Sequence, residues 1–249
     1  MPCRLCLEEK NLIKAHIIPD FMYQELYDQN HSLYKVLLEN PLNYTKIPTG
    51  EYDNNILCSE CDNVRIGQLE DYAAKVFNEG LGIEFANFHY TDVKMTVTHV
   101  KKIDYKKFKL FLLSMLWRAS VTTRESFRIV SLRHYEETIR QMLYKGDPKE
   151  RYDFPCIMIA IRADVPWASQ LIVPPTRIKQ YFRTVYRFLM NGILYLFYIG
   201  EKINLPEPIM EGAISKTNEM RIFHVKKGEG EEILKKYLGF NRWHKVGGK

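Results

Sequence analysis

Apolar residues recur every three or four positions in several segments of the chain, which is the spacing of one helix face. The most apolar of these segments ends at Val121. Glycines, which commonly end helices, follow two of the segments at Gly80 and Gly146. The pattern predicts helices over residues 62–80, 106–121 and 132–144, with shorter helices over 21–27 and 231–238.

Shorter apolar runs, rich in β-branched and aromatic residues, predict strands. They cover residues 12–18, 93–99, 156–161, 170–173, 183–190, 193–199 and 220–225. Asn191-Gly192 separates two of these runs, and this dipeptide is the preferred turn of a two-residue β-hairpin. Residues 30–57 have an extended character interrupted by turn signals. We therefore predict an α+β fold in which helices are mixed with an antiparallel sheet.

The composition is that of a globular protein, because 46% of its 249 residues are hydrophobic and 13% are aromatic. No apolar run follows Met1, so we expect no signal peptide. The longest apolar stretch, residues 193–199, is much shorter than the roughly 20 residues of a membrane-spanning helix. We therefore expect a cytoplasmic protein without a membrane partner, in which cysteines stay reduced.

Four of the five cysteines form two Cys-x-x-Cys pairs that are separated by 51 residues. The first pair is Cys3 and Cys6, and the second is Cys58 and Cys61. Two such pairs offer the four thiolates that tetrahedral zinc prefers. A site with four thiolates has no open position for a substrate, so we predict a structural Zn²⁺. Cys156 lies in an apolar run and is predicted to be a small buried side chain.

A histidine motif lies between the cysteine pairs, and polar residues surround the second pair. The motif reads His16-Ile-Ile-Pro, Asn55 stands three residues before Cys58, and Asp62-Asn63 follow Cys61. In order and spacing, residues 3–63 resemble the HNH endonuclease family. The resemblance implies a zinc-stapled ββα-metal module, formed by a hairpin and a helix, at the N-terminus.

The resemblance also implies roles for individual residues. His16 corresponds to the general base that activates water, and Asn55 to the asparagine that orients the site. Asp62, with Asn63 beside it, stands where the family binds a catalytic Mg²⁺ or Mn²⁺. The implied activity is metal-dependent hydrolysis of phosphodiester bonds, in DNA rather than RNA. Many bacterial HNH-like proteins of this size are similar to anti-phage defence components, which would imply a protein partner in such a system.

Two positions depart from the family pattern. The residue before the catalytic histidine is usually Asp or Glu, and here it is Ala15, which cannot bind a metal ion. Asp62 replaces the usual His or Asn, although a carboxylate suits a hard divalent cation. Another carboxylate would have to replace the missing ligand, and the candidates are Asp20, Asp53 and Glu70.

The departures leave a second interpretation open. In it, His16 forms a hydrogen bond within the zinc module and Asp62 is an ordinary helix N-cap. The chain would then contain a non-catalytic HNH-like zinc domain that binds nucleic acid or a protein partner.

Charge is distributed unevenly along the chain. The net charge of +6 combines −7 over residues 1–100 with +13 over residues 101–249. A polyanion would therefore be attracted by the second part. The candidate phosphate contacts are Lys101, Lys102, Lys106, Lys107 and Arg118, and a second basic group is Arg177, Lys179, Arg183 and Arg187. The alternative for both groups is a solvated surface.

The predicted organisation has two parts. Residues 1–80 form the zinc-stapled HNH-like module, and residues 81–249 form a basic α+β domain to which the sequence assigns no role. No obvious linker separates them, so we expect the module to pack on the larger part.

Overall fold

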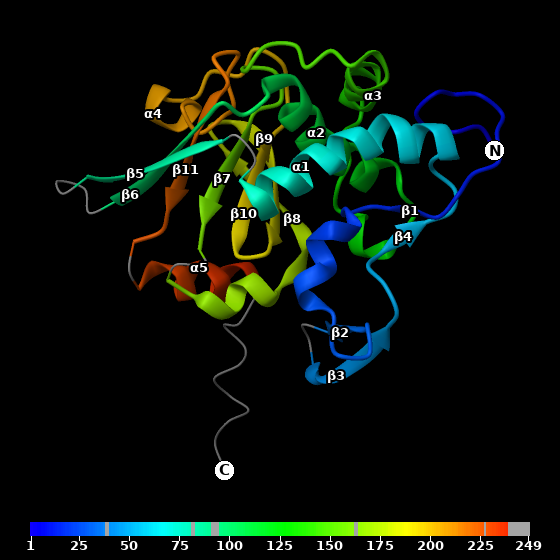
Figure 1. Ribbon diagram of the computed structural model, residues 1–249, viewed down its shortest axis with the longest axis horizontal. Coiled ribbons are helices and arrows are strands. Elements are labelled where there is room, and N and C mark those ends of the chain that lie inside the picture. Colours follow the sequence, from blue (N-terminus) through cyan, green and yellow to red (C-terminus); the bar gives the residue numbers. More distant parts are fainter. Residues whose placement is uncertain (38–39, 81–82, 91–94, 162–163, 227, 239–249) are drawn as a thin grey trace.

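The computed structural model describes residues 1–37, 40–80, 83–90, 95–161, 164–226 and 228–238, and its fold is of the mixed α+β class (Figure 1). Its main sheet has seven strands in the order β5-β6-β11-β7-β10-β9-β8. Two small two-stranded sheets, β1-β4 and β2-β3, belong to the N-terminal part. The α+β prediction is therefore confirmed at the level of fold class.

The N-terminal part is built from short elements that lead into one long helix. The elements are β1 (Ala15–His16), the 3₁₀-helix η1 (Asp20–Leu26), β2 (Leu33–Leu37), β3 (Asn40–Ile47), β4 (Tyr52–Asp53), the π-helix η2 (Glu60–Ile66) and α1 (Gly67–Glu79). Strands β1 and β4 pair antiparallel, with Ala15 opposite Asp53. Figure 1 shows the β2–β3 hairpin extending away from the main sheet. Helix α1 continues directly from η2 and ends at Gly80, whose φ of 61° is left-handed.

The remaining elements form the main sheet and the helices that cover it. They are β5 (Glu84–Tyr90), β6 (Met95–Lys101), α2 (Tyr105–Val121), η3 (Glu125–Phe127), α3 (Tyr135–Lys145), β7 (Cys156–Ala160), η4 (Pro166–Gln170), β8 (Ile172–Gln180), β9 (Arg183–Met190), β10 (Ile193–Tyr198), α4 (Glu207–Met210), β11 (Glu219–His224) and α5 (Glu229–Leu238). Strands β7 and β11 pair parallel, while the other neighbouring strands of this sheet pair antiparallel. The sheet is therefore mixed, which corrects the expectation of a purely antiparallel one.

Local sequence signals account for the ends of several elements. Asn191 and Gly192 have φ values of 50° and 69°, as the predicted type I′ hairpin turn between β9 and β10 requires. The Asp104 carboxylate accepts a hydrogen bond of 2.9 Å from the backbone N–H of Lys107, and so caps the start of α2. Gly146 closes α3 in a left-handed conformation.

Helix α2 lies at the centre of the main hydrophobic core. Every residue from Phe108 to Ala119 is buried, because α1 and α3 pack against α2 and its side chains share one hydrophobic cluster with residues of the sheet. The rings of Phe21, Phe77 and Phe111 join η1, α1 and α2, with centroids 5.9–6.4 Å apart. One continuous hydrophobic cluster therefore contains side chains from both sides of residue 80.

The structure confirms the long predicted elements and corrects several short ones. The predicted strand over residues 12–18 is reduced to β1 and one isolated bridge between Leu12 and Cys58. The segment predicted as a helix over 21–27 is the 3₁₀-helix η1. Gln170 ends η4, and the strand predicted for 170–173 is the longer β8. Residues 93 and 94 of another predicted strand lie outside the described residues, and β6 begins at Met95.

Within the described ranges, no helix has both the length and the apolar character needed to cross a membrane.

Candidate metal centre and adjoining polar site

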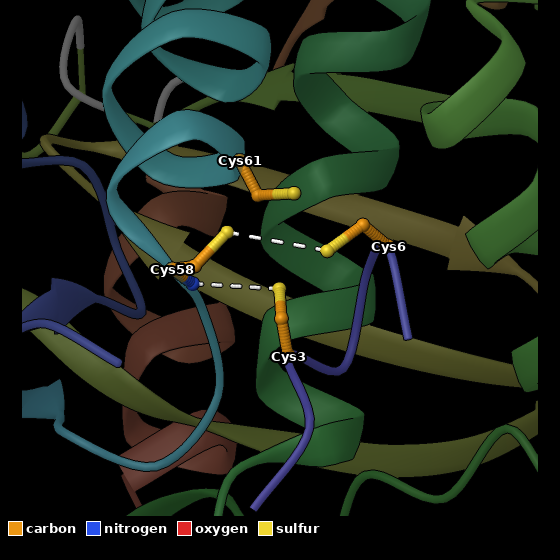
Figure 2. A group of neighbouring side chains, drawn as sticks. All are labelled: Cys3, Cys6, Cys58 and Cys61. Atoms are coloured by element: carbon orange, nitrogen blue, oxygen red, sulfur yellow. Dashed lines mark hydrogen bonds between the residues drawn. The ribbon is translucent and has the colours of Figure 1, made fainter. Parts of the chain in front are cut away.

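The four predicted cysteines converge on one point. Their sulfur atoms all lie within 4.8 Å of one another, and the Sγ atoms of Cys6 and Cys58 are 4.0 Å apart (Figure 2). Tetrahedral zinc with Zn–S bonds of about 2.3 Å separates its sulfur ligands by about 3.8 Å. The cluster therefore has the donor type, the number of donors and nearly the spacing that zinc needs. These four residues could hold a metal ion such as zinc.

Backbone hydrogen bonds bring the two cysteine pairs together. The N–H of Leu7 donates to the carbonyl of Cys3 (2.8 Å), which forms the turn that directs Cys3 and Cys6 to the same side. The N–H of Arg4 donates to the carbonyl of Ile56 (2.8 Å), which places this turn beside the segment leading to Cys58. The N–H of Cys58 also points at the sulfur of Cys3, at 3.4 Å. Chain segments on both sides of the β2–β3 hairpin are thus joined at the cluster.

The thiol groups of the cluster differ in their proton affinity. Burial raises the pKa of Cys61, and the neighbouring Cys3 raises it further. Burial also opposes ionisation of Cys3, but backbone N–H donors outweigh this effect and lower its pKa. One thiolate therefore forms readily while the next is resisted, and a bound cation would supply the charge that favours the others. Cys156 lies apart from the cluster, buried in β7, as predicted.

His16 lies on β1, the strand that pairs with β4, and its side chain is 23% exposed. Its Nε2 atom is 2.9 Å from the hydroxyl of Thr49 and 3.6 Å from a carboxylate oxygen of Asp20. Burial lowers the pKa of His16 below its usual range, although the Asp20 charge acts in the opposite direction. The imidazole is therefore neutral at pH 7 and can accept a proton.

A buried arginine adjoins His16. The side chain of Arg118, on α2, is 1% exposed, and its guanidinium lies 2.6 Å from the carboxylate of Glu70 on α1. The same guanidinium donates to the backbone carbonyl of His16 at 2.6 Å. Arg118 was a predicted surface contact for phosphate, but its guanidinium lies inside the protein and cannot reach an external polyanion in this conformation. Its burial between α1, α2 and β1 is the feature that sequence reasoning missed.

Asp62 lies at the start of the helical segment that carries Glu70. Burial raises the pKa of Asp62 to about 6, and the Arg118 charge opposes this shift while Glu70 adds to it. Among the described residues, no hydrogen-bond donor reaches the Asp62 carboxylate. The charges of Arg118 and Glu70 therefore influence the pKa of both His16 and Asp62.

The other proposed site residues are placed differently. Asn63 is exposed, and its side-chain amide donates to the hydroxyl of Ser59 at 3.0 Å. Asn55 is exposed as well, and its backbone N–H donates to Asp53. The Asp53 carboxylate is buried and accepts hydrogen bonds from Thr122 and Thr123, so it ties β4 to the end of α2. Asp53 therefore has a structural role that leaves it poorly placed to be the replacement ligand.

The arrangement of the described side chains favours one of the two expected metal sites over the other. Within the part of the chain that the structure describes, the four cysteines are the one set of three or more His, Cys, Asp or Glu side chains with converging ligand atoms. Of the candidate carboxylates Asp20, Asp53, Glu70 and Asp62, all of them among the described residues, Asp62 alone has no hydrogen-bond or ion-pair partner for a second, hard cation to displace. This is a sparse set, although Mg²⁺ commonly binds through one or two carboxylates and completes its shell with water and substrate phosphate.

The four predicted basic contacts other than Arg118 are exposed. The ammonium nitrogen of Lys101 lies 3.8 Å from a carboxylate oxygen of Glu219, and Lys102 forms an ion pair with Glu84. The ammonium group of Lys107 lies over the ring of Tyr72. Lys106 and Lys107 thus remain the members of this group that have no ion-pair partner among the described residues.

Comparison of the chain with protein-family models, with curated proteins and with solved structures returned no match.

Proposed function

We propose that the N-terminal part is an HNH-type module that hydrolyses phosphodiester bonds of DNA. The observation that carries the proposal is the position of His16. Its partly exposed, neutral imidazole lies on a strand that pairs with β4, and the charges of Arg118 and Glu70 influence both its pKa and that of Asp62 at the start of the helix. Strand β1, strand β4 and the helical segment that begins at Glu60 follow one another along the chain, and the cysteine cluster joins the two ends of this region. This is the order of elements that the HNH resemblance implies.

The chain's own residues supply the acid–base part of the reaction. With Nε2 held by Thr49 and carrying the ring proton, the Nδ1 atom of His16 takes a proton from the attacking water, a role for which a neutral imidazole is suited. The Thr49 hydroxyl and the Asp20 carboxylate hold the ring from the Nε2 side, and Asp20 favours the imidazolium that forms. Arg118 fixes the backbone of His16 through its carbonyl oxygen.

Asp62 would hold the divalent cation that this reaction needs. The chemistry supplied by such an ion is polarisation of the phosphate and neutralisation of the leaving oxygen. The Asp62 carboxylate fits this role because the described residues offer it no hydrogen-bond donor. Glu70 does not fit it in this conformation, because Arg118 already occupies its carboxylate.

Cleavage of a supercoiled plasmid in the presence of Mg²⁺ or Mn²⁺ tests the proposal. We expect the parent protein to nick or linearise the plasmid, and His16→Ala to lower the rate by about 100-fold or more, which is the usual contribution of a general base. His134→Ala is the matched control, because it removes an exposed histidine next to α3. Cleavage that survives His16→Ala undiminished would refute His16 as the base.

A second candidate function is favoured by the Arg118–Glu70 pair. A permanent buried cation already neutralises Glu70, one of the carboxylates that could replace the missing metal ligand, and Ala15 offers no ligand. The module would then be a non-catalytic zinc domain that binds nucleic acid or a protein. A parent protein that retards DNA in a gel but leaves it uncut with either ion would favour this function.

A further inference from the structure

The tip of the β8–β9 hairpin presents two aromatic residues in an unusual backbone conformation. Gln180 pairs with Arg183, so the turn contains only Tyr181 and Phe182. Their φ values are 48° and 58°, which makes the turn type I′. Asn-Gly is the preferred sequence for this turn, because bulky side chains are disfavoured at positive φ. Two adjacent aromatic residues are therefore held in a conformation that local stability does not favour.

The same two residues are also unfavourably exposed. Phe182 is fully solvated, with a relative exposure of 103%, and Tyr181 is 42% exposed. Neither backbone conformation nor burial explains aromatic side chains at this tip. Strained and exposed residues of this kind point to a binding role.

Positive charge surrounds the tip. Arg177 and Lys179 lie on one face of the hairpin and Arg183 on the other, as the alternation of side chains along β8 and β9 dictates. All three are exposed, and none of them forms an ion pair with a carboxylate of the described residues. The tip therefore joins exposed aromatic surface to unneutralised positive charge.

We propose that this hairpin tip binds single-stranded nucleic acid. Phe182 and Tyr181 stack on unpaired bases, while Arg177, Lys179 and Arg183 contact the flanking phosphates. Single strands suit this surface because every unpaired base offers a flat face for stacking, and the backbone offers regularly spaced negative charge. This tip is outside residues 1–80, so it is a contact separate from the proposed catalytic site.

Strand β9 connects the tip to the N-terminal part of the protein. At its other end, β9 leads to Asn191, whose side-chain amide donates to the Met22 carbonyl of η1 at 2.9 Å. Helix η1 carries Asp20, the neighbour of His16. The eight residues of β9 span about 25 Å at the rise of a strand. The hairpin tip and helix η1 therefore lie at opposite ends of β9.

Fluorescence anisotropy with the full chain and a labelled 20-nucleotide single-stranded DNA tests the proposal. No divalent cation is added, so that binding is measured without cleavage. The main variant replaces the turn, Tyr181→Asn together with Phe182→Gly. We expect it to raise Kd about tenfold or more through lost stacking. Its melting temperature should equal or exceed that of the parent, because Asn-Gly suits the turn.

Two further variants separate the parts of the proposal. Trp167→Ala removes an exposed aromatic residue on η4 and should leave Kd unchanged. The double variant Arg177→Gln with Arg183→Gln should weaken the salt dependence of binding. The negative slope of log K against log salt concentration should become shallower by about 1.4, since each phosphate contact contributes about 0.7 on a single strand.

The proposal is overturned if the turn variant binds the oligonucleotide as tightly as the parent. It is equally overturned if the parent binds phosphatidylserine vesicles and not the oligonucleotide, because the tip would then belong to a membrane surface. The proposal rests on the proposed function only in its choice of nucleic acid as partner. Loss of cleavage with retained binding would count against the catalytic proposal alone, and cleavage that persists in a non-binding turn variant would count against the hairpin alone.

Discussion

Arg118 is a cation that the fold has enclosed completely. Its guanidinium is matched by the Glu70 carboxylate, by the His16 carbonyl and by the Ser114 carbonyl one turn earlier in α2. Burying a charge is costly unless it is paired and hydrogen-bonded, and here both conditions are met. The residue therefore fixes the relative positions of β1, α1 and α2 at the candidate site.

Removing one partner of this pair should be more harmful than removing both. We expect Arg118→Met to lower the free energy of unfolding by about 3 kcal/mol, the lower end of the range for a broken buried pair, because it leaves the partly buried Glu70 carboxylate without a counter-charge. Adding Glu70→Gln to this variant should recover part of the loss. Denaturant unfolding of the two single variants and the double variant gives the coupling energy. Strictly additive losses would show that the two side chains do not stabilise each other.

Lys109, about two and a half turns nearer the start of α2 than Arg118, is a second buried cation with a different character. It is 3% exposed, and its ammonium group donates to the Tyr105 hydroxyl and the Glu150 carbonyl. Burial lowers its pKa to about 8, although carboxylates led by Asp153 act in the opposite direction. The folded protein therefore releases the proton of Lys109 at a lower pH than the unfolded chain does.

This shift predicts a particular dependence of stability on pH. Between pH 8 and 10.5 the unfolded chain keeps the proton of Lys109 while the folded state has released it. Stability due to this residue should therefore rise with pH across this window, by up to about 1.4 kcal/mol per pH unit. Denaturant unfolding of the parent and Lys109→Met at several pH values measures the difference. Lys107→Met, which replaces an exposed lysine of the same helix, is the control and should keep the pH dependence of the parent, whereas Lys109→Met should lose it.

At the scale of elements, periodicity was most informative where the elements are long. The helical spacing over 106–121 predicts α2 to within one residue, and Asn191-Gly192 predicts the β9–β10 hairpin. The segment 12–18 differs, because its backbone hydrogen bonds are made to residues far away in the sequence. The N–H of Ile13 donates to the carbonyl of Leu57, and the N–H of Ile17 donates to the carbonyl of Glu51. A strand that is formed by such separate contacts has no strong pattern of its own.

The cysteine cluster permits a test with an internal control. We expect the parent to retain about one zinc per chain, and Cys61→Ala to lose it and to melt about 10 °C lower or more, since the metal contributes to folding. Cys156→Ala removes a cysteine that is buried in β7 outside the cluster, so it should keep the zinc. Metal analysis and thermal unfolding of the three proteins provide the measurement. Equal zinc content in the parent and Cys61→Ala would contradict the assignment.

At the scale of the whole molecule, the candidate site could be predicted only in part. The cysteine spacing predicted their convergence, because two Cys-x-x-Cys pairs have a strong geometric meaning. The burial of Arg118 could not be predicted, because it depends on α1, α2 and β1 meeting in space. A charge pattern along a sequence does not distinguish a solvated arginine from an enclosed one. Nor did it show the strained aromatic turn at Tyr181, whose φ is a property of the folded hairpin.

The place of β11 in the main sheet bears on the order in which the protein can be completed during synthesis. This strand is the last of the seven along the chain, yet it lies between β6 and β7. Until it emerges from the ribosome, β5–β6 and β7–β10–β9–β8 are two separate sheets with unpaired inner edges. A nascent chain stopped before Glu219 would therefore expose two unpaired strand edges, and the sheet cannot be completed until residues 219–224 have emerged.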